Sequence, residues 1–144
     1  MMKKNTGKLI LVAFLCMMLL SVYSTAEAML QNNTECFINT AHSLKALFKA
    51  NQLIFFGPAG NVTQGVLVYD THLFYDTGHK FTAIPFLAGQ NISFNPDGSV
   101  NSGTLVYDTQ LFDNPNHRHK STYQGGTYTT FNPDGSVQNG TTIP

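Results

Sequence analysis

Short runs of alternating apolar and polar residues fill most of the chain, and the same runs return at a regular spacing. Residues 54–71 are followed 38 positions later by a similar segment, 92–109, in which Leu105 to Thr109 repeat Leu67 to Thr71 without change. A third, shorter copy begins at Phe131. Alternation with a period of two is typical of β-strands, and a repeat of this length indicates stacked supersecondary units. The pattern predicts a mainly β protein: a short tandem β-hairpin repeat array, either an open β-ladder or a solenoid-like sheet.

Each copy contains a tight-turn signature. Asn95-Pro96-Asp97-Gly98 and its counterpart at 132–135 combine a proline that presets φ with a glycine that accepts a positive φ. We therefore expect three-residue hairpin loops, with turns at 57–60 and 95–98. The paired, buried residues that this register predicts are Phe56 with Val62, Phe94 with Val100, and Phe131 with Val137.

After Val100 the alternation slips by one residue. A β-bulge restores the phase of a strand and is often marked by glycine. We therefore expect bulges at Gly103 and, in the first copy, at Gly65.

The segment ahead of the array has a different spacing. Thr40 or Asn39 can cap a helix, and Leu44, Leu47 and Phe48 then recur at i, i+3 and i+4. We expect one N-terminal capping helix over residues 41–51, which would cover an otherwise open sheet edge. The expected organisation is an N-terminal segment, 29–53, and a β-repeat domain, 54–144, with units 54–91 and 92–130 and a partial unit 131–144.

The first 28 residues have the pattern of a cleaved signal peptide. Lys3, Lys4 and Lys8 precede an apolar run, 9–22, and Ala26-Glu27-Ala28 supplies the small residues that precede a cleavage site. An uncleaved anchor is the alternative, but the run is shorter than the roughly 20 residues that span a bilayer. We expect cleavage after Ala28 and a secreted or periplasmic protein without a stable membrane anchor.

Charge and cysteine content narrow the choice of partners. Only 11% of the residues are charged, and without the signal five basic side chains face seven acidic ones. Nucleic acid is disfavoured as a partner because its binding needs clustered Lys and Arg.

Cys36 is the one cysteine after residue 28, so no intramolecular disulfide can form. A buried or incidental thiol is favoured over a catalytic one paired with His42.

The pattern Phe-x-x-x-Gly-x-Val-x-x-Gly-x-Leu occurs at 56–67 and again at 94–105. It resembles the hairpin cores of MORN-type repeats, over about a third of each unit. The resemblance implies a ladder of hairpins that acts as a scaffold or contact surface without catalysis of its own. It carries no functional residue over to this chain.

Histidines in the array are the first candidates for chemistry: His72, His79, His117 and His119. The spacing His117-x-His119 could place two imidazoles on one side of a strand. A zinc site needs three or four ligands with supporting groups, and no such spacing occurs. Solvated loop histidines are therefore favoured over a metal site.

Carboxylates are the second candidates. Asp70 and Asp108 recur in register with their neighbours, which favours a turn-stabilising role over an acid–base pair. Asn95 with Asp97, and the equivalent pair Asn132 with Asp134, could offer oxygens to Ca²⁺, but they fit the turn signature better.

The sequence thus favours an exported non-catalytic β-repeat module, binding or structural, that contacts a surface, polymer or protein partner. Tyr123 and Tyr128 are candidate contact residues, and weak self-association through the C-terminal edge strand is expected. The alternative is a small secreted hydrolase or metal-dependent enzyme that uses the loop histidines with Asp70 or Asp108. No catalytic, cofactor-binding or metal-binding residue is assigned, and no cofactor is expected.

Overall fold

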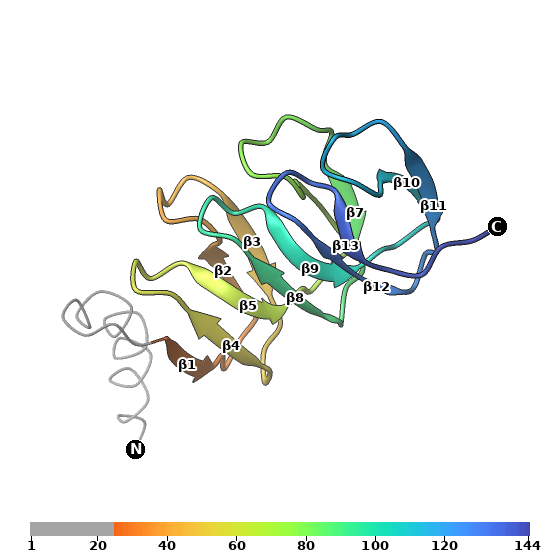
Figure 1. Cartoon of the computed structure of the whole chain (residues 1–144). Helices are drawn as coiled ribbons and strands as arrows, with labels where there is room; N and C mark the ends of the chain where they lie inside the picture. Colours follow the sequence, from red (N-terminus) through yellow and green to blue (C-terminus); the bar gives the residue numbers. More distant parts are fainter. Residues whose placement is uncertain (1–24) are drawn as a thin grey trace, which may run out of the picture.

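The computed structural model describes residues 25–144, so most of the expected signal peptide lies outside the described residues. The described part is mainly β, as the alternation predicts, and contains thirteen strands (Figure 1). They are β1 (Ala26–Met29), β2 (Thr34–Phe37), β3 (Lys45–Phe48), β4 (Leu53–Phe56), β5 (Val62–Val66), β6 (Thr71–Leu73), β7 (Ile84–Phe86), β8 (Asn91–Phe94), β9 (Val100–Thr104), β10 (Thr109–Phe112), β11 (Lys120–Tyr123), β12 (Tyr128–Phe131) and β13 (Val137–Asn139). Over this range, no helix is long and apolar enough to cross a membrane.

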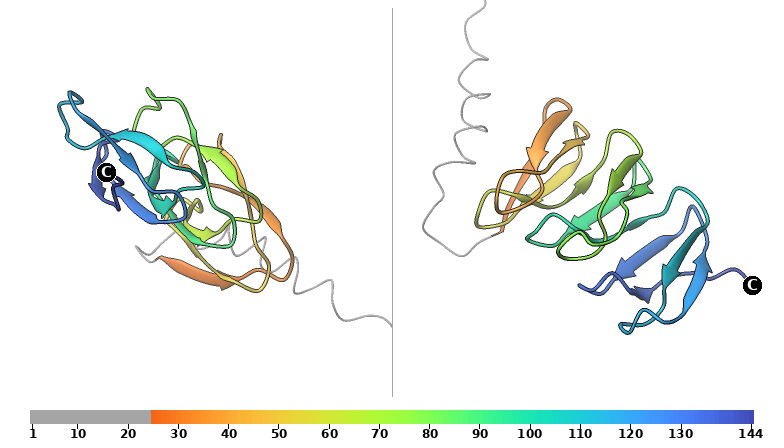
Figure 2. Two further views of the ribbon diagram at one scale, coloured as in Figure 1. Left: turned by 90° about the vertical axis from the view of Figure 1, so that its right-hand side faces the viewer. Right: turned by 90° about the horizontal axis from the view of Figure 1, so that it is seen from above.

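The strands form one long sheet and three small ones. The long antiparallel sheet has the order β1-β4-β5-β8-β9-β12-β13, and it contains what we call the inner hairpins, β4–β5, β8–β9 and β12–β13. Three two-stranded sheets, β2–β3, β6–β7 and β10–β11, are the outer hairpins. Figure 2 shows the pairs of hairpins following one another from the N-terminal to the C-terminal end. One outer and one inner hairpin make a structural unit, and the three units cover 34–70, 71–108 and 109–144.

The capping helix expected over residues 41–51 is wrong, because these residues belong to the first outer hairpin. Oδ1 of Asn39 accepts hydrogen bonds from the N–H groups of Ser43 and Leu44, both at 3.0 Å, and so closes a loop. His42 has a φ of 51°, which a right-handed helix does not allow. Lys45–Phe48 then alternates between exposed and buried positions and pairs with β2. A short apolar run is compatible with the spacing of a helix and with that of a strand, and in this segment the pairing with β2 makes it a strand.

The expected inner turns are confirmed. Phe56 lies opposite Val62, Phe94 opposite Val100, and Phe131 opposite Val137. All six side chains are buried. The turn glycines Gly98 and Gly135 have φ values of 87° and 86°. The Asn-Pro-Asp-Gly signature therefore sets the register of the sheet.

The bulges lie two residues before the expected glycines. Ser93 pairs with Ser102 while Phe94 pairs with Val100, so the extra residue on β9 is Asn101. Gly103 has a different role: a Cβ there would lie 2.9 Å from Cδ1 of Phe86, the ring that ends the outer hairpin of the same unit. The first unit repeats both features, with the bulge at Thr63 and the ring of Phe48 against Gly65. Glycine lets this ring pack directly on the sheet.

Neighbouring units are joined by backbone hydrogen bonds. The loops of the first two outer hairpins each bond the inner turn of the next unit: Thr40 N–H donates to the carbonyl of Pro96 at 2.8 Å, and Thr77 N–H donates to that of Pro133 at 2.7 Å. Pairing of β5 with β8, and of β9 with β12, continues the long sheet across each junction. We call this combination the unit junction.

Replacing Gly103 with alanine should destabilise the fold by about 1–3 kcal/mol, because the added methyl group must displace the ring of Phe86. The matched change Asn101→Ala, at an exposed position of the same strand, should stay within about 0.5 kcal/mol of wild type. Urea unfolding of both variants measures the difference. Equal effects at the two positions would contradict the packing role of the glycine.

Candidate functional site

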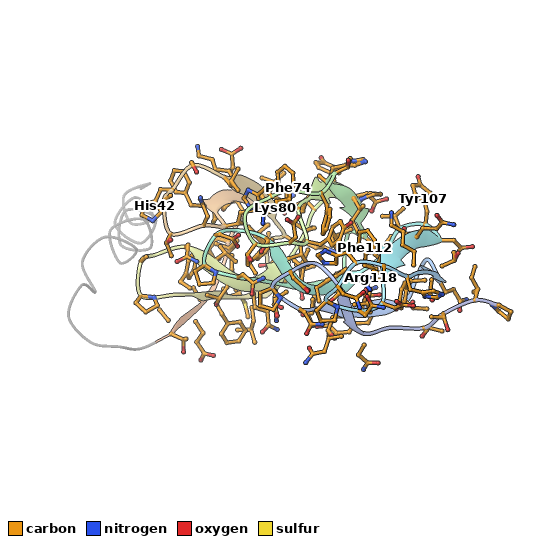
Figure 3. The ribbon with its side chains drawn as sticks, turned by 45° about the horizontal axis from the view of Figure 1, so that its top comes forward. His42, Phe74, Lys80, Tyr107, Phe112 and Arg118 are labelled. Carbon is orange, nitrogen blue, oxygen red and sulfur yellow. The ribbon has the colours of Figure 1, made fainter. Side chains whose placement is uncertain are left out.

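The loops of the three outer hairpins carry a histidine at the same structural position. His42, His79 and His117 have φ values of 51°, 53° and 53°, all in the left-handed region. In Figure 3, His42, then Phe74 with Lys80, then Phe112 with Arg118 follow one another along the array. We call these loops, with the inner turns beneath them, the histidine ridge. The sequence repeat found at the inner hairpins did not reveal this third occurrence at His42, since little else in the loop is shared.

Each of these histidines lies between a phenylalanine and the inner turn of its own unit. The ring centroids of Phe74 and His79 are 4.4 Å apart and the rings are stacked. On its other side, Nε2 of His79 lies 3.7 Å from Oδ2 of Asp97. Phe112, His117 and Asp134 repeat the arrangement, with 4.8 Å between the ring centroids and 3.6 Å between Nε2 and Oδ2. In the first unit Nε2 of His42 hydrogen-bonds the carbonyl of Ala59 at 2.8 Å. The histidines therefore link the outer and inner hairpins.

Asp97 and Asp134 are held as carboxylates by their turns. Burial alone would raise the pKa of Asp97, but hydrogen bonds from the hydroxyl and N–H of Ser99 and from the N–H of Gly78, with the nearby His79, hold that pKa below its ordinary value. At Asp134, burial is likewise outweighed by the N–H and hydroxyl of Ser136 and by His117, and the pKa is lowered. Both carboxylates thus serve the turn signature in which the sequence analysis placed them.

His117 and His119 do not share a ligand position. His117 faces Asp134, whereas Nδ1 of the exposed His119 lies 2.5 Å from Oδ2 of Asp113. Its hydrogen bond lowers the pKa of Asp113 against the opposing effect of burial, with help from Ser121. Across residues 25–144 no group of three or more His, Cys, Asp or Glu side chains is placed to hold a metal ion.

Two other sequence candidates lie away from the ridge loops. His72 is exposed on β6, where it pairs with Pro85. Cys36 pairs with Ala46 in the first outer hairpin, and its Sγ lies 3.8 Å from the carbonyl of Thr34. The imidazole of His42 contacts the ring of Phe37 and the carbonyl of Ala59.

The repeated aspartates Asp70 and Asp108 anchor turns at the opposite end of the outer hairpins from the ridge loops. Oδ1 of Asp70 accepts a hydrogen bond from Ala88 N–H at 2.8 Å, and Oδ1 of Asp108 accepts one from Gly125 N–H at the same distance. Each bond crosses from one unit to the next, where the chain enters the following inner hairpin. The structure therefore brings neither aspartate together with the loop histidines.

The tyrosine that precedes each of these aspartates points into solvent. Tyr69 is 69% exposed and Tyr107 is 68% exposed. Their side chains make no hydrogen bond or ring contact with any residue that the structure describes. Both tyrosines belong to the repeated segment of the sequence, but the repeat alone does not predict that they are exposed. The alternation of apolar and polar residues does not predict whether a repeated aromatic side chain is exposed.

The two tyrosines expected as contact residues, Tyr123 and Tyr128, behave differently. Tyr123 is 5% exposed and belongs to the core, and burial, with a smaller effect of Asp113, raises the pKa of its phenol. The expectation that Tyr123 is a contact residue is therefore wrong. Tyr128 is 53% exposed, but its hydroxyl donates to Ser102 Oγ at 2.7 Å across the outer face of the sheet.

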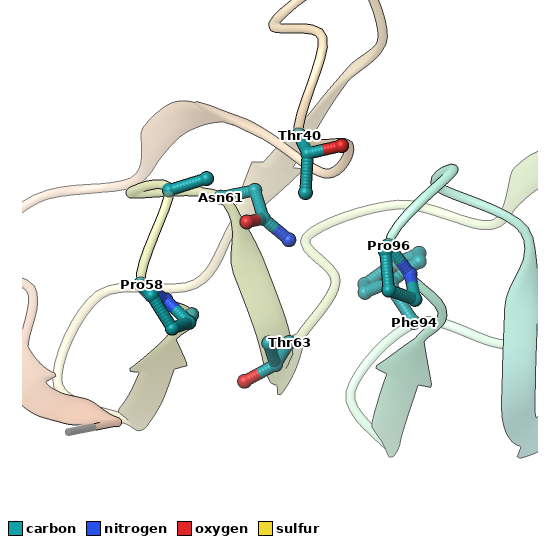
Figure 4. A pocket seen from close by; sticks show the side chains of 8 residues that line it. Thr40, Pro58, Asn61, Thr63, Phe94 and Pro96 are labelled. Carbon is teal, nitrogen blue, oxygen red and sulfur yellow. The ribbon is translucent and has the colours of Figure 1, made fainter. Parts of the chain in front are cut away.

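A shallow recess of about 240 Å³ separates the first two inner turns (Figure 4). Its labelled lining is Thr40, Pro58, Asn61, Thr63, Phe94 and Pro96. Gly57 and Ala59 in its lining correspond to the larger asparagine and aspartate of the later turns. The recess is mostly apolar, and its lining has no charged side chain and no histidine that could act as an acid or a base.

The lowered pKa values of Asp97 and Asp134 predict an acid-sensitive ridge. A carboxylate whose pKa is lower in the folded state stabilises the fold above its unfolded pKa, near 3.8, and loses that contribution as the pH falls through the folded pKa. The double variant Asp97→Asn with Asp134→Asn should be less stable at neutral pH and should lose less stability below about pH 4. Melting temperatures between pH 2 and pH 7 measure both effects. Removing the donors with Ser99→Ala and Ser136→Ala should flatten the profile in the same way, and parallel profiles for wild type and variants would contradict this account.

No protein-family model, curated protein or solved structure matches the chain.

Proposed function

We propose that the chain is an exported, non-catalytic binding module that contacts an extended polymer through Tyr69 and Tyr107. The observation that carries the proposal is the repeated exposure of these two rings, at 69% and 68%, at the same position of successive units. Export is proposed from the signal-like sequence of the first residues.

Three of the other four residues of the repeated segment have side chains with structural roles. In the first copy Leu67 is fully buried, Asp70 anchors the next unit, and the hydroxyl of Thr71 bonds the carbonyl of Tyr69 at 2.7 Å. The second copy uses Leu105, Asp108 and Thr109 in the same way. Folding thus explains these residues but not the exposed tyrosine rings. A binding role explains them, since Tyr presents a large rigid face at low entropic cost.

The spacing of the two rings favours an extended ligand. Each unit contributes two strands to the long sheet, so equivalent positions of successive units are about 10 Å apart along the array. A ligand that presents the same face at regular intervals could contact both rings. Because the module has few charges, an uncharged polysaccharide suits it better than a polyanion.

The enzyme alternative receives less support from the geometry. The Nε2 atoms of His79 and His117 are buried beneath their loops, where a substrate does not reach them. They face Asp97 and Asp134, whose other oxygens are occupied by the turns, rather than Asp70 or Asp108. These contacts support a structural role for the histidine ridge.

Weak self-association through the C-terminal edge is a second part of the proposal. Among the described strands, β13 pairs with β12 alone. Another strand could therefore add to its free side. Pro115 occupies the place of Thr40 and Thr77 in the third unit and has no N–H, so one hydrogen bond of the unit junction cannot form there. Association at this edge is accordingly expected to be weak.

The tyrosine contact is tested by co-sedimentation of the purified protein with three insoluble, uncharged polysaccharides: cellulose, chitin and mannan. We expect wild type to be retained on at least one of them, and the double variant Tyr69→Ala with Tyr107→Ala to lose at least tenfold in apparent affinity, because each ring supplies contact area. Its melting temperature should stay within a few degrees of wild type, since both rings are exposed.

Tyr128→Ala is the matched control, because it removes an exposed tyrosine that lies on strand β12 and not in the segments that carry Tyr69 and Tyr107. It should be retained like wild type. Retention of the double variant at the wild-type level, or of no protein on any of the three polymers, would count against the proposal.

A further inference from the structure

Residues 26–33 repeat the last part of a structural unit. Ala28 lies opposite Ile54 in the pairing of β1 with β4, as Gly65 lies opposite Ile92 in the pairing of β5 with β8. The pairs on either side of Ala28 and Gly65 have the same register. β1 therefore pairs with the inner hairpin of the first unit as β5 pairs with that of the second unit and β9 with that of the third. The array therefore begins with the closing strand of a further unit.

The hydrogen bonds after β1 match those of the later units. Asn51 N–H donates to the carbonyl of Leu30 at 2.8 Å, the counterpart of Gly89 and Leu67 at 3.0 Å. Oδ1 of Asn33 accepts from Ala50 N–H at 2.8 Å, as Oδ1 of Asp70 accepts from Ala88. The hydroxyl of Thr34 bonds the carbonyl of Asn32 at 2.8 Å, as that of Thr71 bonds Tyr69. Leu30 itself is buried in the core.

Cleavage after Ala28 would cut through this strand. It would remove Ala26, Glu27 and Ala28, of which the two alanines pack against the core. β4 would then become an open edge, with the backbone of Ile54 and Phe55 unpaired on that side and Leu53 already 51% exposed. Such an edge is a site for unwanted pairing.

We propose that the export signal is removed two residues earlier, by hydrolysis of the Ala26–Glu27 bond. Ser24-Thr25-Ala26 supplies the same small-x-small pattern as the later alanines. The cut would leave Glu27–Met29, the same three-residue length that pairs at each later junction, Gln64–Val66 and Ser102–Thr104. A signal peptidase adds water across the bond, which leaves a carboxylate on Ala26 and an amino group on Glu27. The inference rests on the proposed export of the chain but not on its tyrosine contacts.

The test is the first residue of the exported protein. The full chain is produced in a bacterial host with a general secretory pathway, and the exported fraction is analysed by N-terminal sequencing and intact mass. We expect Glu27 as the first residue. Any other first residue, Met29 above all, would overturn the proposal.

A charge placed in the recognised pattern tests the same bond at positions that the proposed cleavage removes from the exported protein. Ser24→Glu alters the position two before Ala26, and the processed fraction should fall several-fold, whereas Thr25→Glu adds the same charge at the unrestricted position and should be processed like wild type. Equal processing of the two variants would contradict the assignment. A chain that stays full length would also overturn it, together with the proposed export, while retention of the purified protein on polymers would still test the tyrosine contacts.

Discussion

The unit junction is the constraint on which the rest of the structure depends. A single pair of hairpins cannot bury its apolar face, and each unit becomes stable by stacking on the next. The loop of one outer hairpin fixes the following inner turn through the Thr40–Pro96 and Thr77–Pro133 hydrogen bonds, and the strands on the other side continue one sheet. Because the turn glycines Gly98 and Gly135 fit tightly against the preceding loop, the junction leaves little freedom of position.

The proposed function depends on a tyrosine that lies beside each unit junction. The aspartate that ties each unit to the next is flanked by a tyrosine, and holding the aspartate in place holds the tyrosine backbone in the same geometry. Two rings at 69% and 68% exposure are thereby presented in the same way by two units. The histidine ridge lies at the other end of the outer hairpins and joins the two hairpins within each unit. The tyrosines proposed to bind a ligand and the histidines that join the hairpins therefore lie at opposite ends of the outer hairpins.

Sequence reasoning succeeded where a local rule decides the outcome and failed where tertiary pairing does. Asn-Pro-Asp-Gly predicts its own register, and the pairs around Phe94 and Phe131 follow from it. Residues 41–51 share only scattered positions with the later outer hairpins. The helical spacing of three leucine and phenylalanine side chains therefore predicted a helix, whereas the strand is recognised only from its pairing with β2.

At Ala28 the sequence is compatible with two roles, because a small residue suits both a cleavage motif and the crowded position that glycine fills in the later units. Exposure of Tyr69 and Tyr107 could not be read from alternation, since turns have no inward face.

Native-state hydrogen exchange of the backbone amides tests the unit junction most directly. Thr40 and Thr77 are exposed loop residues, yet their N–H groups donate across the junction to Pro96 and Pro133. The account predicts that both amides exchange as slowly as those of the sheet interior, such as Gly103, because opening them requires separation of the units. Exchange of Thr40 and Thr77 at the rate of unprotected loop amides would contradict it.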